Sequence, residues 1–491
     1  MKASVITTKE ESIEPANWES LKELGHRMVD EMLDHMRGGR ERKAWQRPSP
    51  ASKKLMQEAL PVLPSSTEEL YEEFREHILP YNADNGHPRF WSWVQGGGTP
   101  TGMLADMLAS GMNANVSIGE HMAMYVEKQV IEWSKQMMGF PEEATGILTS
   151  GASIANITAL IVARNQFNKD IKKKGIRAVE GQMLVYGSSE THNCAIKAAE
   201  VIGIGSDNFR RVPVDGQYRI RIDELKRMIE EDRRAGHIPF CIVGNAGTVN
   251  TGAIDPLREL VKIAKSEKLW LHIDGAFGAI PKILPEFEQE LEAIGEADSL
   301  SFDFHKWMYV NYEVACVLVK DGKLHREAFA SQVNYLLSHE RGLSGGPDPY
   351  SNYGMELSRG FKALKVWMSL KENGIEKYQR LIRQNLQQAQ FLSELIEQSE
   401  ELELLAPVPL NIVCYRFNPG GIETKKLNTL NKNILMELHE QGIATPSYTL
   451  LEGRYAIRVA NTNHRSRRED FKVLVTETIR IGKELLQKEF L

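Results

Sequence analysis

Short apolar runs alternate with longer amphipathic segments between about residues 86 and 370 of the chain. Buried strands are predicted for the apolar runs Met183–Tyr186, Phe240–Val243, Trp270–Ile273, Ser299–Phe302 and Val314–Val319. Helices are predicted where apolar residues recur at helical spacing, over Ile154–Arg164, Cys194–Ile202, Ile222–Arg233 and Leu257–Ser266. Strands that alternate with helices predict a mostly parallel sheet covered on both faces, and therefore an α/β domain.

The segments on either side of this region have different patterns. Residues 1–85 are polar and helical, with apolar positions at helical spacing between Trp18 and Met36, and prolines divide the segment into short pieces. Such an arm has little core of its own, so we expect it to pack on another domain or subunit. Residues 371–491 combine long helices with two further strands, Asn411–Phe417 and Tyr455–Ala460, and predict a small α+β domain.

The composition narrows the class of protein without indicating a reaction. Of the 491 residues, 42% are hydrophobic and 26% are charged, as is ordinary for a folded protein. The net charge of −6 argues against nucleic acid or an anionic membrane as a partner, and no apolar stretch is long enough to span a bilayer. The four cysteines lie far apart, so we expect reduced bystanders rather than disulfides or a metal site. Because the first residues also lack the apolar core of a signal peptide, we expect a cytoplasmic enzyme.

Candidate chemistry lies at the predicted carboxyl ends of the strands, where open α/β sheets bind ligands. One strand leads into the stretch Ser301–Trp307, in which His305 and Lys306 are adjacent. A lysine after a strand is usually solvated. A lysine enclosed in a cleft can instead lose its charge and act as a nucleophile that forms a Schiff base.

A second strand leads into Asp274, which is followed by the small residues Gly275 and Ala276. An aspartate after an apolar run is often a helix N-cap. It can also be a fixed anion that keeps the pyridine nitrogen of a cofactor protonated, and that proton makes the ring an electron sink. The small residues would let a flat ring approach the backbone.

Two further motifs precede predicted helices. The turn Thr149–Asn156 places glycine and small hydroxyl residues before a helix, a pattern that can hold a phosphate through backbone N–H groups. It is not a GxxxxGK[ST] loop, which disfavours ATP or GTP. His192 follows another strand, where a histidine can cap a helix, pack in the core or stack on an aromatic cofactor. Along the chain, the order is the phosphate turn, the histidine, the aspartate and then the lysine. The parts of a pyridoxal 5′-phosphate site follow one another in the same order.

These motifs resemble those of the group II pyridoxal-phosphate-dependent amino-acid decarboxylases, the family of the aromatic-L-amino-acid, histidine and glutamate decarboxylases. The resemblance runs from about His87 to Ala460. It rests chiefly on HIDGA at 272–276 and HKW at 305–307, with HPRF, TSGAS, THN, NAGT and YAIRV in support. It implies fold type I of the pyridoxal-phosphate-dependent transferases, which is similar to aspartate aminotransferase, and pyridoxal 5′-phosphate as the cofactor.

The resemblance also implies roles for single residues. Lys306 corresponds to the lysine that forms the Schiff base, and Asp274 to the partner of the pyridine nitrogen. The other cofactor contacts that it implies are His192 and Ala276 on the two ring faces, Thr248 beside the cofactor, and Ala152, Ser153 and His305 on the phosphate. The domains expected from pattern and resemblance together are an arm at 1–85, a cofactor-binding domain at 86–370 and a small domain at 371–491.

A long connection, Ser338–Asn352, is rich in glycine and proline, and its length is typical of a lid. Similar enzymes carry here a mobile loop that reaches into the other subunit's site, with a tyrosine that returns a proton to the substrate carbon. Counting back from LSRGF at 357–361 places that tyrosine at Tyr350. Tyr353 is the alternative, and an ordinary exposed loop tyrosine is the plainest interpretation. Related enzymes with phenylalanine here tend to be aldehyde synthases, so Tyr350 favours simple decarboxylation.

The resemblance implies conversion of an L-amino acid to its amine and CO2 by a homodimer with shared active sites. Phe90, Trp91 and Trp93 predict an aromatic wall, and favour L-Dopa, tyrosine, tryptophan or phenylalanine as substrate; core packing is the alternative for them. The stretch Asn113–Gly119 matches a region that similar enzymes donate to the neighbouring subunit's pocket. Here it is small and polar, which instead favours an acidic or short polar substrate such as glutamate. A pyridoxal-phosphate-dependent aldehyde synthase is the third alternative.

Overall fold

The computed structural model describes residues 12–330 and 341–489. Its largest sheet has seven strands in the order β2-β8-β7-β6-β5-β3-β4. The strands are β2 (Thr145–Thr149), β3 (Met183–Ser188), β4 (Phe209–Val212), β5 (Ile238–Asn245), β6 (Trp270–Asp274), β7 (Ser299–Asp303) and β8 (Ala315–Val319). All run in the same direction except β8, which pairs antiparallel with β2 and β7. The predicted α/β class and mostly parallel sheet are confirmed.

Helices pack on both faces of this sheet because its strands are apolar on both sides. In β5, Ile242 packs into one core cluster, whereas Cys241 and Val243 pack into another. The helices that cover the two faces include α6 (Ala152–Phe167), α8 (Asn193–Val201), α9 (Ile222–Arg234) and α10 (Leu257–Glu267). The four helices predicted between the strands are therefore all present.

A second, smaller sheet has the order β1-β11-β12-β10-β9. Its strands are β1 (Phe90–Trp91), β9 (Leu402–Leu404), β10 (Ile412–Phe417), β11 (Thr445–Leu451) and β12 (Arg454–Ala460), and α14 (Thr424–Glu440) and α15 (Arg468–Glu489) belong to the same domain. Strand β1 pairs in parallel with β11. Residues shortly after position 86 thus belong to the sheet of the small domain.

The long helix α13 (Ala363–Glu397) connects the two sheets. Its first half packs Val366 and Ile382 into the core of the large domain, and its second half packs Leu392 into the core of the small domain. Gly374, with φ of 65°, interrupts the helix within the part that packs on the large domain. Residue 370, the expected domain boundary, therefore lies within this connecting helix.

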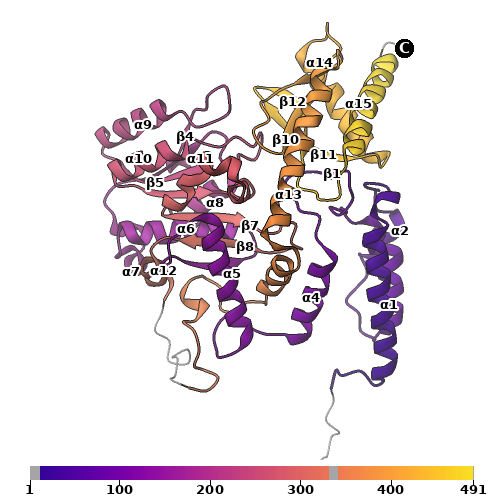
Figure 1. Cartoon of the computed structure of the whole chain (residues 1–491), viewed down its shortest axis with the longest axis horizontal. Helices are drawn as coiled ribbons and strands as arrows, with labels where there is room; N and C mark the ends of the chain where they lie inside the picture. The colour runs from indigo at the N-terminus through magenta and orange to yellow at the C-terminus, as the bar shows by residue number, and fades with distance from the viewer. Residues whose placement is uncertain (1–11, 331–340, 490–491) are drawn as a thin grey trace, which may run out of the picture.

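Figure 1 shows the N-terminal helices α1 (Trp18–Arg37) and α2 (Pro50–Leu55) standing apart from the seven-stranded sheet, beyond α4 (Pro100–Met112). The arm meets the small domain, where Arg40 lies 2.8 Å from Asp470. Within α1 the one buried side chain is Leu24, as expected of an arm with little core of its own. In the described part of the chain, no helix has the length and apolar character that crossing a membrane requires.

A buried ion pair fixes the start of the candidate phosphate turn. Glu127 of α5 (Met122–Met138) is fully buried and pairs with Arg359. Burial raises the pKa of Glu127, and the charge of Arg359 opposes this shift. Arg359 also donates to the carbonyls of Val116 at 2.6 Å and Leu148 at 2.8 Å. The pair therefore anchors β2 directly before residues 149–153.

Removing one partner of this pair is expected to destabilise the fold strongly. In Glu127→Leu the guanidinium of Arg359 stays buried without its counter-charge, so the free energy of unfolding should fall by about 3–5 kcal/mol. Arg383→Ala, which removes a half-exposed pair with Glu286, is the matched control and should cost less than about 1 kcal/mol. Urea unfolding followed by circular dichroism measures both. Equal effects in the two variants would contradict this role of the buried pair.

Candidate active site

One cavity of about 740 Å³ lies between the carboxyl ends of the large sheet's strands and strands β11 and β12 of the small sheet. Most of the residues predicted from the sequence meet there. Its walls include Trp93, Ala152, Ser153, His192, Asp274, Ala276, His305 and Lys306. The position matches the place where open α/β sheets bind their ligands.

Lys306 reaches the cavity from the turn after β7. Its Nζ lies 2.7 Å from Oδ2 of Asp303, which is 1% exposed. Burial acts to lower the pKa of Lys306, but the charge and hydrogen bond of Asp303 outweigh it and raise the pKa. Enclosure beside Asp303 therefore favours the charged form of this lysine. Sequence reasoning misses Asp303, although it lies in the same motif, three residues before the lysine.

Asp303 also accepts a hydrogen bond from the first turn of α6. The N-cap residue Gly151 has no side chain to offer, and Oδ1 of Asp303 accepts the N–H of Ala152 at 2.8 Å. Ser153 is exposed to the cavity rather than acting as the cap. The turn thus places small residues and the positive end of a helix at the cavity wall, as the sequence pattern predicts.

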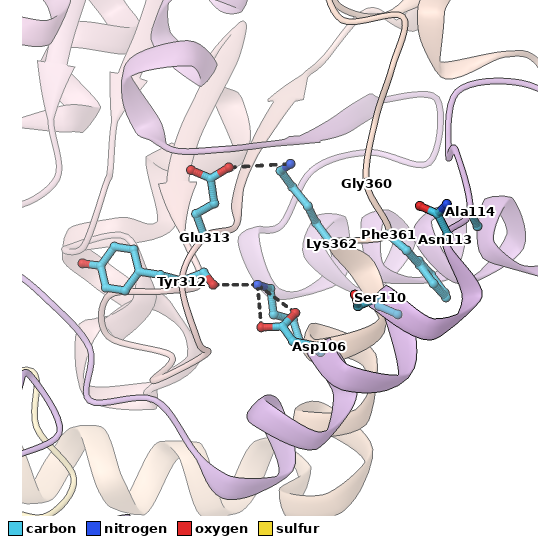
Figure 2. Close-up of a pocket in the computed structure, with 11 residues that line it drawn as sticks. Asp106, Ser110, Asn113, Ala114, Tyr312, Glu313, Gly360, Phe361 and Lys362 are labelled. Carbon is cyan, nitrogen blue, oxygen red and sulfur yellow. Dashed lines mark hydrogen bonds and ion pairs between the residues drawn. The ribbon is translucent and has the colours of Figure 1, made fainter. Parts of the chain in front are cut away.

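His305 is buried beside this turn and lines the cavity. Its ring packs against Tyr312, with 4.3 Å between the ring centroids. Tyr312 and Glu313 also line a second cavity of about 360 Å³, whose lining residues Figure 2 shows. There Lys365 donates to the carbonyl of Tyr312 at 2.9 Å and pairs with Asp106 at 3.1 Å. This buried cation holds the wall segment against which His305 packs.

Asp274 ends β6, is 5% exposed and faces the cavity. Its Oδ1 accepts the N–H of Ala276 at 3.1 Å, and its Oδ2 accepts Nδ2 of Asn156 at 3.0 Å. The Cys194 thiol lies 3.7 Å from the same Oδ2, and burial raises its pKa, so it keeps its proton and donates. Three donors therefore stabilise the negative charge. Cys194 is not the bystander that the sequence suggests, and Asn156 is missed altogether.

His192 occupies the N-cap position of α8, as one of its three interpretations has it, and also lines the cavity. That it stacks on a cofactor stays a prediction. Its Nδ1 accepts the N–H of Cys194 at 3.1 Å. Withdrawal from water lowers the pKa of His192, while the charge of Asp274 acts in the opposite sense. The ring is therefore neutral near pH 7 and carries its proton on Nε2.

Three of the predicted residues lie away from the cavity wall. Thr248 is buried, and its hydroxyl lies 3.1 Å from that of Thr251. Phe90 and Trp91 are buried in β1, and Trp91 stacks on Phe471 in the core of the small domain at 4.8 Å. The aromatic wall is corrected to Trp93, because pairing of β1 with β11 draws its two neighbours into the small domain.

The two candidate loop tyrosines lie away from the cavity of their own chain. Tyr350 is 8% exposed, with the guanidinium of Arg359 4.9 Å from its ring centre. Tyr353 donates to Asp348 at 2.8 Å. Residues 338–340 of the expected loop lie outside the described residues, so the action of this loop on a neighbouring site stays a prediction.

Arg458 of β12 closes the cavity from the small domain and is missed by sequence reasoning, although it belongs to the YAIRV motif. It is buried and donates to the carbonyls of Trp93 at 2.7 Å, Asn250 at 3.1 Å and Val249. Burial lowers the pKa of Arg458 to about 10, so it stays charged near neutrality. Trp93 has φ of 53°, which is rare for a bulky residue, and the bond from Arg458 holds it there.

Comparisons with known proteins agree with this geometry. The profile of the pyridoxal-dependent decarboxylase conserved domain matches residues 50–418. The chain is 33% identical to an aromatic-L-amino-acid decarboxylase of Bacillus atrophaeus, over 95% of this chain and 96% of that protein. It is 28% identical to a phenylacetaldehyde synthase of Arabidopsis thaliana, over 91% of this chain and 93% of that protein.

A crystal structure of Oryza sativa TDC with PLP and tryptamine superimposes with a TM-score of 0.88 at 22% identity, covering 96% of this chain and 100% of that one. Since the family profile spans most of the chain and the bacterial relative matches over nearly its full length, two independent comparisons agree. The chain belongs to the pyridoxal-dependent decarboxylase family and is an amino-acid decarboxylase with pyridoxal 5′-phosphate as its cofactor.

Proposed function

We propose that this decarboxylase acts on aromatic L-amino acids and releases the corresponding amines. The observation that carries the proposal is the convergence of Lys306, Asp274 and the exposed ring of Trp93 on one cavity. The similarity over nearly the whole chain to an aromatic-L-amino-acid decarboxylase supports the same substrate class.

The residues at the cavity fit the cofactor. Lys306 offers the amine for a covalent link, and Asp274 offers the anion for the pyridine nitrogen. His192 and Ala276 would face the ring, with Thr248 behind the wall, and Ala152, Ser153 and His305 would hold the phosphate. When bound, the cofactor supplies an electron sink for the pair of electrons that the departing carboxylate leaves behind.

The protein's own groups then have to move protons and exclude water. Lys306 must give up a proton before its amine can react, and Oδ2 of Asp303 at 2.7 Å is the group placed to hold it. Asp274 supplies a fixed negative charge in a largely dry environment, where it acts more strongly than in water. We propose that Tyr350 of the partner subunit returns a proton to the substrate carbon, with the Nε2–H of His192 as the relay.

The donors of Arg458 are occupied, so an acidic substrate would have to pair with Arg211, the other arginine at the cavity. A side-chain carboxylate would need a cation with hydrogen-bond donors to spare. Arg458 already donates to three backbone carbonyls and to the hydroxyl of Ser447 at 3.1 Å. Trp93 and Tyr448, each 60% exposed and at the cavity, instead offer flat apolar faces that suit an aromatic side chain.

We also propose a cytoplasmic homodimer with shared active sites. Apolar side chains are exposed on and near α4, among them Met107, Met112 and Met122, each at least 50% exposed, and Leu343 at 75%. Such a group of exposed apolar side chains is typical of an interface. The carbonyl of Leu343 accepts the N–H of Glu120 at 3.0 Å, which links the tyrosine-bearing segment to the same face. Four free cysteines fit a reducing compartment.

Lys306→Ala tests the covalent role of the lysine. We expect CO2 release to fall on the order of a thousandfold or more, because the reacting amine is lost. The visible absorption band of the bound cofactor should disappear in the same variant. Lys320→Ala, at a lysine that donates to the exposed carbonyl of Glu296, is the control and should leave both readouts unchanged. A Lys306→Ala enzyme that keeps the band would contradict the assignment.

The substrate class is tested by a screen of the proteinogenic amino acids and L-Dopa, with amine, aldehyde and hydrogen peroxide measured together. We expect amine from aromatic substrates. Trp93→Ala should raise KM for them by about tenfold with a smaller effect on kcat, because it removes apolar contact area, whereas Trp93→Phe should stay close to wild type. Faster turnover of glutamate than of any aromatic amino acid would overturn the proposal. Aldehyde with hydrogen peroxide as the main product would assign an aldehyde synthase instead.

The loop tyrosines are separated by matched substitutions. Tyr350→Phe is expected to lower amine formation at least tenfold and to raise the share of aldehyde, because the proton donor is lost. Tyr353→Phe should keep the product of the wild type. The opposite pattern would assign the role to Tyr353.

Mixing two inactive variants tests whether Tyr350 acts across the subunit interface. A mixed dimer of Lys306→Ala and Tyr350→Phe chains has one site with both groups intact only if the tyrosine comes from the other chain. Random re-pairing of the two kinds of chain should then restore about a quarter of wild-type amine formation, since half of the dimers are mixed and each has one working site. Failure to recover any activity in verified mixed dimers would contradict shared active sites.

A further inference from the structure

Behind Asp274 lies a cluster of polar side chains that the proposed reaction does not use. The Asn156 network comprises Asn156, His272, Ser299 and Ser301, all fully buried and none of them part of the cavity wall. Alternation along β6 places His272 and Asp274 on one face, and β7 pairs Ser299 and Ser301 opposite them. Helix α6 lies over this face and inserts Asn156 between the two strands' side chains.

The direction of these hydrogen bonds follows from the carboxylate, which accepts and cannot donate. Nδ2 of Asn156 must therefore face Oδ2 of Asp274, at 3.0 Å, and its Oδ1 faces the opposite way. There Oδ1 accepts Nε2–H of His272 at 2.8 Å and the hydroxyl of Ser301. Nδ1 of His272 is then the acceptor for the hydroxyl of Ser299, at 2.9 Å.

His272 can donate from Nε2 and accept at Nδ1 only while its ring is neutral. Burial lowers the pKa of His272 to about 4, and the nearby charge of Asp274 acts in the opposite direction without cancelling it. Trp270 completes the series, because its Nε1–H donates to Ser299 at 2.8 Å. All the hydrogen bonds from the indole to the carboxylate thus point the same way, and bonds in such a chain polarise one another.

We propose that Asn156 is a positioning residue for Asp274, and that His272 and Ser301 hold its amide with Nδ2 facing the carboxylate. The proposal rests on the role proposed above for Asp274 as the anion that faces the pyridine nitrogen. Without donors on its Oδ1, only the bonds of its Nδ2 to Asp274 and to Sγ of Cys194, at 3.1 Å, oppose a half-turn of the Asn156 amide. That turn would set a carbonyl oxygen against the buried carboxylate and disfavour its negative charge.

A purely structural role is the alternative, because every buried polar group needs a partner. The two roles differ in what they affect. A structural role concerns folding alone, whereas a positioning role also sets the affinity for the cofactor and the electronic state of its ring. Both of the latter are measured without any substrate.

Asn156→Asp is the sharpest substitution. It keeps the size of the side chain and the acceptor for His272 and Ser301, but it turns an oxygen instead of an N–H group toward Asp274. We expect the dissociation constant for pyridoxal 5′-phosphate, from titration of the apoenzyme, to rise about tenfold or more. The pH dependence of the visible absorption of the reconstituted enzyme should change as well. Asn165→Asp, on the same helix and also buried, is the control. Its dissociation constant for pyridoxal 5′-phosphate should stay within about twofold of the wild-type value.

The two substitutions of His272 test the orienting role. His272→Gln keeps a donor toward Asn156 and should retain the affinity for pyridoxal 5′-phosphate within about threefold, whereas His272→Leu should lose about tenfold. Ser301→Ala is an independent variant should His272→Leu not fold, with Ser134→Ala, another buried hydroxyl, as its control. We expect the affinity for pyridoxal 5′-phosphate to be similar in the wild type and His272→Gln, lower in Ser301→Ala and lowest in His272→Leu.

The proposal is overturned if Asn156→Asp and Ser301→Ala bind the cofactor like the wild type with unchanged spectra, or if His272→Gln is as poor as His272→Leu. Thermal unfolding of each apoenzyme shows whether a lost affinity is only lost folding. A wild type that binds pyridoxal 5′-phosphate but releases CO2 from no aromatic amino acid would contradict the proposed substrate class. These affinity measurements would still decide the role of Asn156.

Discussion

The site depends on keeping one buried carboxylate, that of Asp274, charged and directed at the cavity. Moving an ionised carboxylate out of water costs several kcal/mol unless hydrogen-bond donors replace the lost solvent. Three donors do so here: the N–H of Ala276, the amide of Asn156 and the thiol of Cys194. They come from the turn after β6, from α6 and from α8, so the carboxylate is stable only when these elements are correctly packed.

A second carboxylate, that of Asp303, compensates the charge of Lys306. Asp303 neutralises Lys306 with one oxygen and accepts the first N–H of α6 with the other. Because Ser299, Ser301 and Asp303 alternate along one face of β7, the strand that leads to the lysine also supports Asn156 and the helix start. The buried ion pair of Arg359 with Glu127 and the partly exposed pair of Lys365 with Asp106 then fix the walls around this centre.

Local patterns of the sequence predict the repeated elements and the residues at strand ends. The strands β3, β5 and β8 contain continuous apolar runs, and Asp274, His192 and Lys306 lie at or within a few residues of the end of a predicted strand. Strand β11 escapes prediction because it alternates buried and exposed residues and is rich in polar side chains. Asn156, Asp303 and Arg458 are missed because their partners lie on other elements; Asn156 and Asp274 are 118 positions apart. Trp91 is misplaced for the same reason, since its face is set by pairing with the distant β11.

We propose that Asp274 and its donors hold a negative charge against the pyridine nitrogen of the cofactor. The most direct measurement is nitrogen NMR of the wild-type enzyme reconstituted with pyridoxal 5′-phosphate labelled with ¹⁵N in the ring. We expect the chemical shift of a protonated pyridinium, with a resolved coupling to its proton, across the pH range in which the enzyme is folded. A shift typical of unprotonated pyridine near neutral pH would contradict it.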